Sequence, residues 1–157
     1  MVFSELNMVH PFREGNGRTQ RVFLETVANV VGMTFDWDAI TRERMVACSI
    51  ASANGDEGSI PRLFADALDP ERASALKKVN RFLQSQLPDW NERYVATTVE
   101  GREYTGKLGG AAGDDFIMRV DGERSWFASG KVVDLKGEAS KPGEDITFTA
   151  TEWKPFG

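Results

Sequence analysis

The segment from residue 10 to residue 21, HPFREGNGRTQR, carries the side chains best suited to chemistry. Its glycine-rich turn, Gly15-Asn16-Gly17, leads directly into a predicted helix. Such a turn lets successive backbone N–H groups point into one concavity, and the N-terminus of the following helix adds partial positive charge. The turn therefore predicts an anion site suited to a di- or triphosphate.

Charged side chains flank this turn. Arg18 and Arg21 are three residues apart, so they share one face of the predicted helix and can hold phosphate oxygens. Glu14 is placed to bind Mg²⁺, which prefers one or two carboxylates together with substrate phosphates. His10 is a base able to take a proton from an incoming hydroxyl near neutral pH. Together these residues predict a site for a polyphosphate and Mg²⁺ with a basic group beside it.

The segment resembles the signature of the Fic family, His-Pro-Phe-x-(Asp/Glu)-Gly-Asn-Gly-Arg-x-x-Arg, and matches it at every defined position. Residues 3–9 look similar to the end of the helix that precedes this motif, and residues 35–37 and 41–53 look similar to the region that follows it. The resemblance covers roughly residues 1–70. It implies nucleotidyl transfer, usually of AMP from ATP to a Ser, Thr or Tyr hydroxyl of a target protein.

The resemblance also implies a role for each matching residue. His10 would deprotonate the target hydroxyl, and Glu14 would hold Mg²⁺ or Mn²⁺ between the α- and β-phosphates of ATP. Gly15, Asn16 and Gly17 would cradle phosphate. Arg18 and Arg21 would neutralise the departing pyrophosphate end. Such a reaction depends on positioning and charge neutralisation more than on covalent assistance.

Some features of the family are not found in this sequence. Only nine residues precede His10, so we expect residues 1–88 to form a Fic-type helical domain without its N-terminal helices and flap. An inhibitory Ser/Thr-x-x-x-Glu-(Gly/Asn) helix is not visible either, and an antitoxin-like protein would have to supply it. The apolar stripe of Phe23, Val27, Val30 and Val31 needs partners, which makes self-association a further hypothesis.

Composition limits the remaining possibilities. The 157-residue chain carries 24 acidic and 19 basic residues, a net charge of −5, which argues against bulk binding to nucleic acid. One cysteine and one histidine exclude a zinc site built from these side chains and an internal disulfide. No apolar run approaches the roughly 20 residues of a membrane span. We expect a cytoplasmic protein, and the resemblance to secreted Fic effectors implies delivery to a host cell by a type IV secretion system.

The first half of the sequence predicts helices over residues 18–31, 41–53, 59–68 and 70–87. Gly32 stands where a C-terminal cap would lie, and Thr41 and Ser59 are expected N-caps. Asp69 followed by Pro70 is a strong helix start, and Pro88 ends that helix. Cys48 lies in an apolar-patterned helix and is expected to be buried.

The second half contains ten of the fifteen glycines and has short alternating runs instead. Strands are predicted over residues 94–99, 103–108, 115–120, 123–128, 131–135 and 146–153, with turns at Glu100-Gly101 and Asp121-Gly122. The expected fold class is α+β, with residues 89–157 forming a five- or six-stranded OB- or SH3-like barrel. Its default role is structural or in partner docking, since its charge is negative and its aromatics fit strand positions.

Two other functions remain open at this level. A catalytically impaired Fic remnant could keep the motif only as a nucleotide pocket and bind a protein or nucleic acid through its barrel. Transfer of a different group, such as UMP or phosphocholine, is also compatible, because the motif fixes the phosphate chemistry and not the base.

Overall fold

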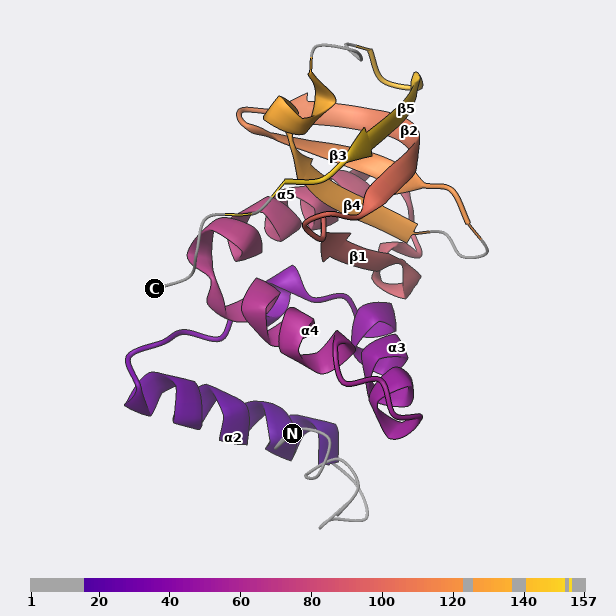
Figure 1. The fold of residues 1–157 in the computed structure, drawn as a ribbon. Coiled ribbons are helices and arrows are strands. Elements are labelled where there is room, and N and C mark those ends of the chain that lie inside the picture. Colours follow the sequence, from indigo (N-terminus) through magenta and orange to yellow (C-terminus); the bar gives the residue numbers. More distant parts are fainter. Residues whose placement is uncertain (1–15, 123–125, 137–140, 152, 154–157) are drawn as a thin grey trace.

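The computed structural model describes residues 16–122, 126–136, 141–151 and 153, and it is a mixed helical and sheet structure. Four helices come first: α2 (Asn16–Val30), α3 (Arg42–Ala53), α4 (Ser59–Leu68) and α5 (Pro70–Gln86). Two 3₁₀ turns, η1 (Trp37–Ala39) and η2 (Trp90–Glu92), lie before α3 and after α5. Figure 1 shows the sheet against α5, with α2 lying on the far side of α3 and α4 from the sheet.

The helix boundaries follow capping signals in the sequence. Gly32 has a positive φ of 79° after α2, as expected of a C-terminal glycine. Thr41 caps α3 by accepting a hydrogen bond from the Arg44 N–H. Asp69 caps α5 in the same way, with Pro70 at its first position. These three predictions are confirmed, and α5 ends two residues before Pro88.

The start of α4 differs from the prediction. Ser59 is the first helical residue rather than the cap, and Gly58 precedes it. Asp56 supplies the capping oxygen, because its Oδ1 accepts hydrogen bonds from the Gly58 and Ser59 N–H groups at 2.7 and 3.2 Å. A carboxylate three residues before the helix therefore satisfies the donors that Ser59 was expected to satisfy.

The five strands form one sheet in the order β1-β4-β3-β2-β5. Their bounds are β1 (Tyr94–Thr97), β2 (Glu103–Ala112), β3 (Asp115–Val120), β4 (Trp126–Lys131) and β5 (Asp145–Thr149). Strands β2, β3 and β4 pair antiparallel in sequence, β5 adds to β2, and β1 pairs parallel with β4. The mixed helix-and-sheet class is confirmed. The barrel is not, because β1 and β5 stand at opposite edges and the described sheet is not closed.

Two local strand predictions are wrong. Residues 131–135 were expected to be a strand, but η3 (Val132–Leu135) is a 3₁₀ turn that buries Asp134 and Leu135. The Glu100-Gly101 turn has the expected positive φ, 78° at Gly101, yet it does not close a hairpin. Its flanking strands do not pair, because β1 is aligned beside β4 instead of β2.

One apolar cluster connects the helices with the sheet. It combines Leu76, Val79 and Leu83 on α5 with Val95 on β1, all at most 1% exposed. Ile117 and Phe127 of the sheet pack against it. A second cluster lies between the strands and η3, and a third lies among α2, α3 and α4 around Phe35. The two sides of the predicted boundary between residues 88 and 89 therefore share the first of these clusters.

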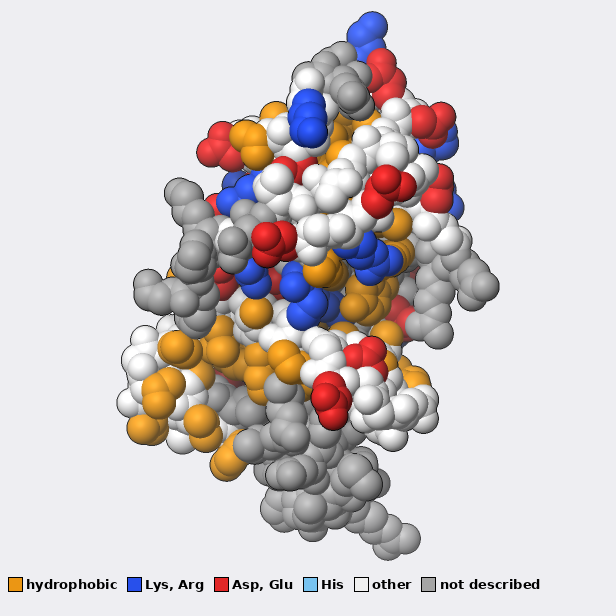
Figure 2. Space-filling model, viewed as in Figure 1, with side chains coloured by type: hydrophobic (Ala, Val, Ile, Leu, Met, Phe, Trp, Pro, Cys, Tyr) orange, Lys and Arg blue, Asp and Glu red, His pale blue; other side chains and the backbone are white. Residues whose placement is uncertain are grey.

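Helix α2 leaves an apolar face exposed. Ala28 is buried. Six larger apolar residues on α2 and just after it remain between 36% and 81% exposed, namely Val22, Phe23, Val27, Val30, Val31 and Met33. Figure 2 shows hydrophobic side chains gathered over the lower part of the molecule, where α2 lies in the same view. The expectation that this stripe needs a further partner agrees with its exposure among the described residues.

Candidate active site

The first turn of α2 lies within the motif. Asn16 and Gly17 are its first two residues, and no acidic residue lies in that turn. The first four N–H groups of a helix lack intrahelical acceptors, and they carry partial positive charge. The backbone of α2 thus begins where the sequence analysis placed the anion site, with no carboxylate in the turn to compete for it.

Most of the predicted site residues cannot be compared with the structure. His10, Glu14 and Gly15 lie outside the described residues. For Asn16, Gly17 and Arg18 the structure describes the backbone as helical and nothing of the side chains. Their roles stay predictions from the motif.

Arg21 is the predicted site residue whose side chain is described. It is exposed, and its guanidinium carbon lies 5.2 Å from the centroid of the Trp37 ring, a cation–π distance. Trp37 is itself held by Phe35, whose ring centroid is 4.3 Å away, and Phe35 meets Phe64 edge-to-face at 5.4 Å. These aromatic contacts position Trp37 of η1, and the last arginine of the motif lies against its ring.

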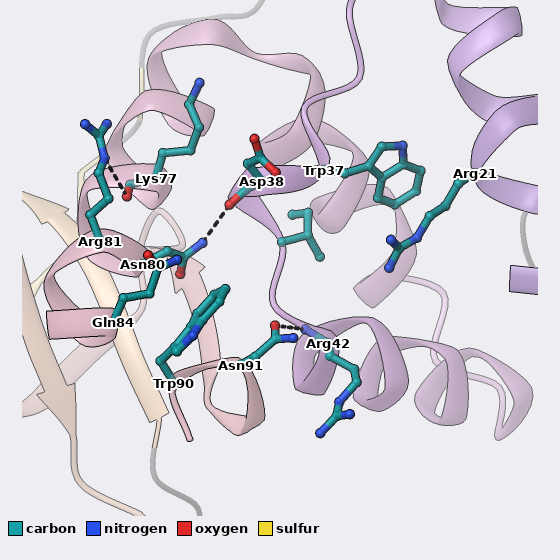
Figure 3. A pocket seen from close by; sticks show the side chains of 11 residues that line it. Arg21, Trp37, Asp38, Arg42, Lys77, Asn80, Arg81, Gln84, Trp90 and Asn91 are labelled. Atoms are coloured by element: carbon teal, nitrogen blue, oxygen red, sulfur yellow. Dashed lines mark hydrogen bonds between the residues drawn. The ribbon is translucent and has the colours of Figure 1, made fainter. Parts of the chain in front are cut away.

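Arg21 also lines a pocket of about 590 Å³. Figure 3 shows side chains from α2, η1, α5 and η2 converging on it. The lining residues are Arg21, Trp37, Asp38, Ile40, Arg42, Lys77, Asn80, Arg81, Gln84, Trp90 and Asn91. Four of them are cations and one is a carboxylate, so the lining is positive although the whole chain has a net charge of −5. A positive lining of this kind favours an anionic ligand.

The α5 side of this pocket was missed by the sequence analysis. Lys77, Asn80, Arg81 and Gln84 are spaced by three and four residues, so they share one face of α5. That spacing of polar residues beside the stripe of Leu76, Val79 and Leu83 was visible in the sequence. The sequence could not show that η1 and η2 would fold against this face of α5 and enclose it.

Cys48 plays no part in this pocket. It is 1% exposed, and burial raises the pKa of its thiol, although Arg44 nearby opposes that shift. Its sulfur lies 3.9 Å from the Tyr94 hydroxyl. A buried thiol with a raised pKa is a poor nucleophile, which agrees with the predicted packing role.

Among residues 16–122, 126–136, 141–151 and 153, no group of three or more His, Cys, Asp or Glu side chains is placed to hold a metal ion. Within the same residues, every helix is too short or too polar to cross a membrane.

Comparison with known proteins relates this chain to one protein family. Residues 1–28 match the model of the Fic/DOC family. The solved structure of the type IV secretion system effector protein BepA superposes with a TM-score of 0.85 and 37% identity, covering 98% of this chain and 52% of that one. The N-terminal end of the chain thus matches the Fic/DOC family, and these likenesses support a Fic-family protein.

Curated relatives carry a matching name. A protein adenylyltransferase of Bartonella henselae is 40% identical over 153 residues, which is 95% of this chain. The protein adenylyltransferase VbhT of Bartonella schoenbuchensis is 50% identical over 60 residues, or 38% of this chain. This chain spans 28% of the length of the first relative and 13% of the second. The activity of such a whole protein is therefore a proposal for this chain.

Proposed function

We propose that this chain carries the nucleotide-binding and proton-accepting part of a Fic-type protein adenylyltransferase. The observation that carries the proposal is the complete motif over residues 10–21 in a chain 40% identical to a protein adenylyltransferase over nearly its whole length. The reaction transfers AMP from ATP to a Ser, Thr or Tyr hydroxyl of a target protein.

In this proposal His10 takes the proton from the target hydroxyl. The hydroxyl oxygen forms a bond to the α-phosphorus of ATP, and the bond from that phosphorus to the departing pyrophosphate breaks. General-base help of this kind is worth about 10²–10⁴ in rate. Arg18 and Arg21 neutralise the pyrophosphate end. The exposed Arg21 guanidinium lies against the Trp37 ring, 5.2 Å from its centroid.

The phosphates are held chiefly by backbone. Asn16 and Gly17 present N–H groups at the N-terminus of α2, where the helix dipole favours negative charge. By its place in the motif, Gly15 would add its own N–H to them. Glu14 is the residue that would hold Mg²⁺ or Mn²⁺, and a single carboxylate beside phosphate oxygens is a donor set that Mg²⁺ accepts. The metal would neutralise charge on the phosphates when bound.

The partners follow from the same chemistry. The target is a protein with a modifiable hydroxyl. An antitoxin-like inhibitory protein and self-association through the exposed apolar face of α2 are further proposals. Nucleic acid is not proposed as a partner, since the residues after 88 are net negative. We also propose cytoplasmic residence with delivery by a type IV secretion system, supported by the likeness to BepA.

The two-domain division, with residues 1–88 as the Fic-type helical domain and 89–157 as an OB- or SH3-like unit, is proposed on composition. The described sheet contributes five strands of the expected kind, and its closure into a barrel belongs to this proposal.

Labelling with ATP tests the proposed activity. The chain is incubated with a cell lysate, Mg²⁺ and ATP labelled at the α-phosphate, and label on protein is expected. His10→Ala should lower labelling by about 10²–10⁴-fold, to background. Arg13→Ala is the matched control, because Arg13 occupies an undefined position of the motif, and it should label like the unchanged chain.

Nucleotide binding measured in parallel separates the outcomes. ATP binding that is weakened by Arg18→Ala and Arg21→Ala, without any label transfer, would contradict the transferase and leave a nucleotide-binding module. Labelling that survives His10→Ala would contradict the role of the histidine. Label from UTP in preference to ATP would show that the transferred group is not AMP.

A further inference from the structure

We propose that the pocket between α5, η1 and η2 binds an acidic peptide segment. The proposal adds a second ligand to the nucleotide and does not depend on catalysis. Arg21, the motif residue whose side chain the structure describes, also lines this pocket. The pocket's volume of about 590 Å³ is in the range of ligand sites, roughly 300–1,000 Å³.

The first argument is an unfilled acceptor on α5. Asn80 is 2% exposed and lines the pocket. Its Nδ2 donates a hydrogen bond to the Asp38 carbonyl oxygen at 2.9 Å, which fixes the orientation of the amide (Figure 3). Its Oδ1 has no hydrogen-bond partner among the described residues. A buried acceptor without a partner is destabilising, so a ligand N–H there would be favoured.

The second argument is an unfilled donor on η1. The buried indole N–H of Trp37 likewise has no acceptor among the described residues. Trp37 lines the same pocket as Asn80. A ligand with both an N–H and a C=O group matches this acceptor and this donor in kind. A peptide backbone offers one of each per residue.

The third argument is the placement of charge. Figure 3 shows Lys77 and Arg81 on one side of the cavity and Arg21 and Arg42 on the other. Lys77 is paired with Asp36 at 2.7 Å and Arg42 with Glu92 at 2.8 Å. Within the described part of the chain, Arg21 and Arg81 form no ion pair with a carboxylate. Two cations without such a pair, one on each side, favour a ligand with more than one negative charge along its length.

These features together favour a peptide over a nucleotide. A nucleotide concentrates its charge at its phosphate end, whereas the pocket has cations on both sides. Side-chain amides of Asn80, Gln84 and Asn91 line the space between them. Amides pair well with peptide N–H and C=O groups. Acidic side chains of an extended segment could then reach the cations on either side.

Peptide titration tests the proposal. The probe is a blocked peptide of alternating glutamate and serine, titrated at low ionic strength by calorimetry and by intrinsic tryptophan fluorescence, to which Trp37 and Trp90 in the pocket contribute. The same peptide with glutamine in place of glutamate is the ligand control. We expect the glutamate peptide to bind and the glutamine peptide to bind much more weakly.

Gln84→Glu places a negative charge in the pocket and should weaken binding of the glutamate peptide about fivefold or more. Gln86→Glu is the matched control, since Gln86 is exposed on the same helix and does not line the pocket. It should leave binding unchanged. His10→Ala should also leave peptide binding unchanged, which separates this proposal from the proposed catalysis. Circular dichroism confirms that each variant is folded.

Several results would overturn the proposal. These are no binding of the glutamate peptide, equal binding of the glutamine peptide, or equal weakening by Gln84→Glu and Gln86→Glu. Displacement of the peptide by ATP, with ATP binding weakened by Gln84→Glu and not by Gln86→Glu, would assign the pocket to the nucleotide instead.

Discussion

Arg44 and Asp66 form an ion pair that protein encloses on all sides. Arg44 is 1% exposed and Asp66 is fully buried, and Nη1 of the arginine lies 2.6 Å from Oδ2 of the carboxylate. Thr97 completes the arrangement, because its hydroxyl donates to Asp66 Oδ1 at 2.6 Å. Burial alone would lower the pKa of Arg44, but the adjacent Asp66 helps to raise it overall. Arg44 thus stays charged, and its contact with Asp66, together with Thr97, ties α3 and α4 to β1.

Removing the carboxylate should be costly. Asp66→Asn would leave the Arg44 charge buried without its counter-ion, and the free energy of unfolding should fall by about 3–5 kcal/mol. Urea unfolding measures it. Asp145→Asn is the matched control, because its partner Lys107 and Asp145 itself are 57% and 81% exposed. Exposed pairs contribute little to stability. Equal losses of unfolding free energy in the two variants would show that the buried pair contributes no more to stability than the exposed pair.

At the scale of one element, the carboxylate of Asp56 stabilises the start of α4. Its carboxylate accepts hydrogen bonds from the Gly58 and Ser59 N–H groups and from the Ser59 hydroxyl at 3.0 Å. These bonds stabilise the charged form, and the backbone hydrogen bond from Gly58 contributes most to lowering the pKa of Asp56. A lowered folded-state pKa means that the stabilisation is present only while the carboxylate is ionised.

The sign of the pH effect follows. The contribution of Asp56 should be complete above the ordinary aspartate pKa of about 3.9 and should be lost as the pH falls through its lower folded value. Asp56→Ala should therefore lower the urea midpoint at pH 5, and its difference from the unchanged chain should shrink toward pH 2. Glu57→Ala is the matched control for loss of an exposed acidic side chain. A difference that persists unchanged at pH 2 would contradict a role for the ionised cap.

The same helix start shows how far sequence reasoning reaches. Helices α2, α3 and α5 were predicted closely, because Gly32, Thr41 and Asp69 act through local backbone bonding that a short window of sequence contains. At α4 both Asp56 and Ser59 could cap, and local rules do not decide between two oxygens three residues apart. The choice depends on the turn that residues 54–58 adopt.

Strand pairing was the less predictable part. Gly101 was correctly expected to have a positive φ, but a turn residue does not say which strands lie beside each other. The parallel alignment of β1 with β4 joins segments about 30 residues apart and is determined by packing on α5. The pocket was missed for the same reason. Its polar face on α5 was visible in the sequence, whereas its enclosure by η1 and η2 is a tertiary contact.

At the scale of the whole molecule, the helices and the sheet are held together across residue 88 by several kinds of contact. The α5 and β1 side chains share a core, and the Thr41 hydroxyl donates to the Arg93 carbonyl at 2.6 Å. Lys131 of β4 reaches Glu71 of α5 at 3.0 Å. Surface pairs of this kind contribute little alone, so the coupling depends mainly on the apolar cluster.

Leu76→Ala tests this coupling, because Leu76 is fully buried in the cluster that contains Val95 and packs against Phe127. Truncating it should cost about 2–5 kcal/mol. If the halves unfold together, hydrogen exchange should accelerate at β2 and β3 as much as in α5, although Leu76 belongs to the helical side. Phe82→Ala is the control on the same helix, since Phe82 is 37% exposed, and it should accelerate exchange much less. Faster exchange confined to the helices would mean that residues 1–88 and 89–157 unfold independently, as two separate domains would.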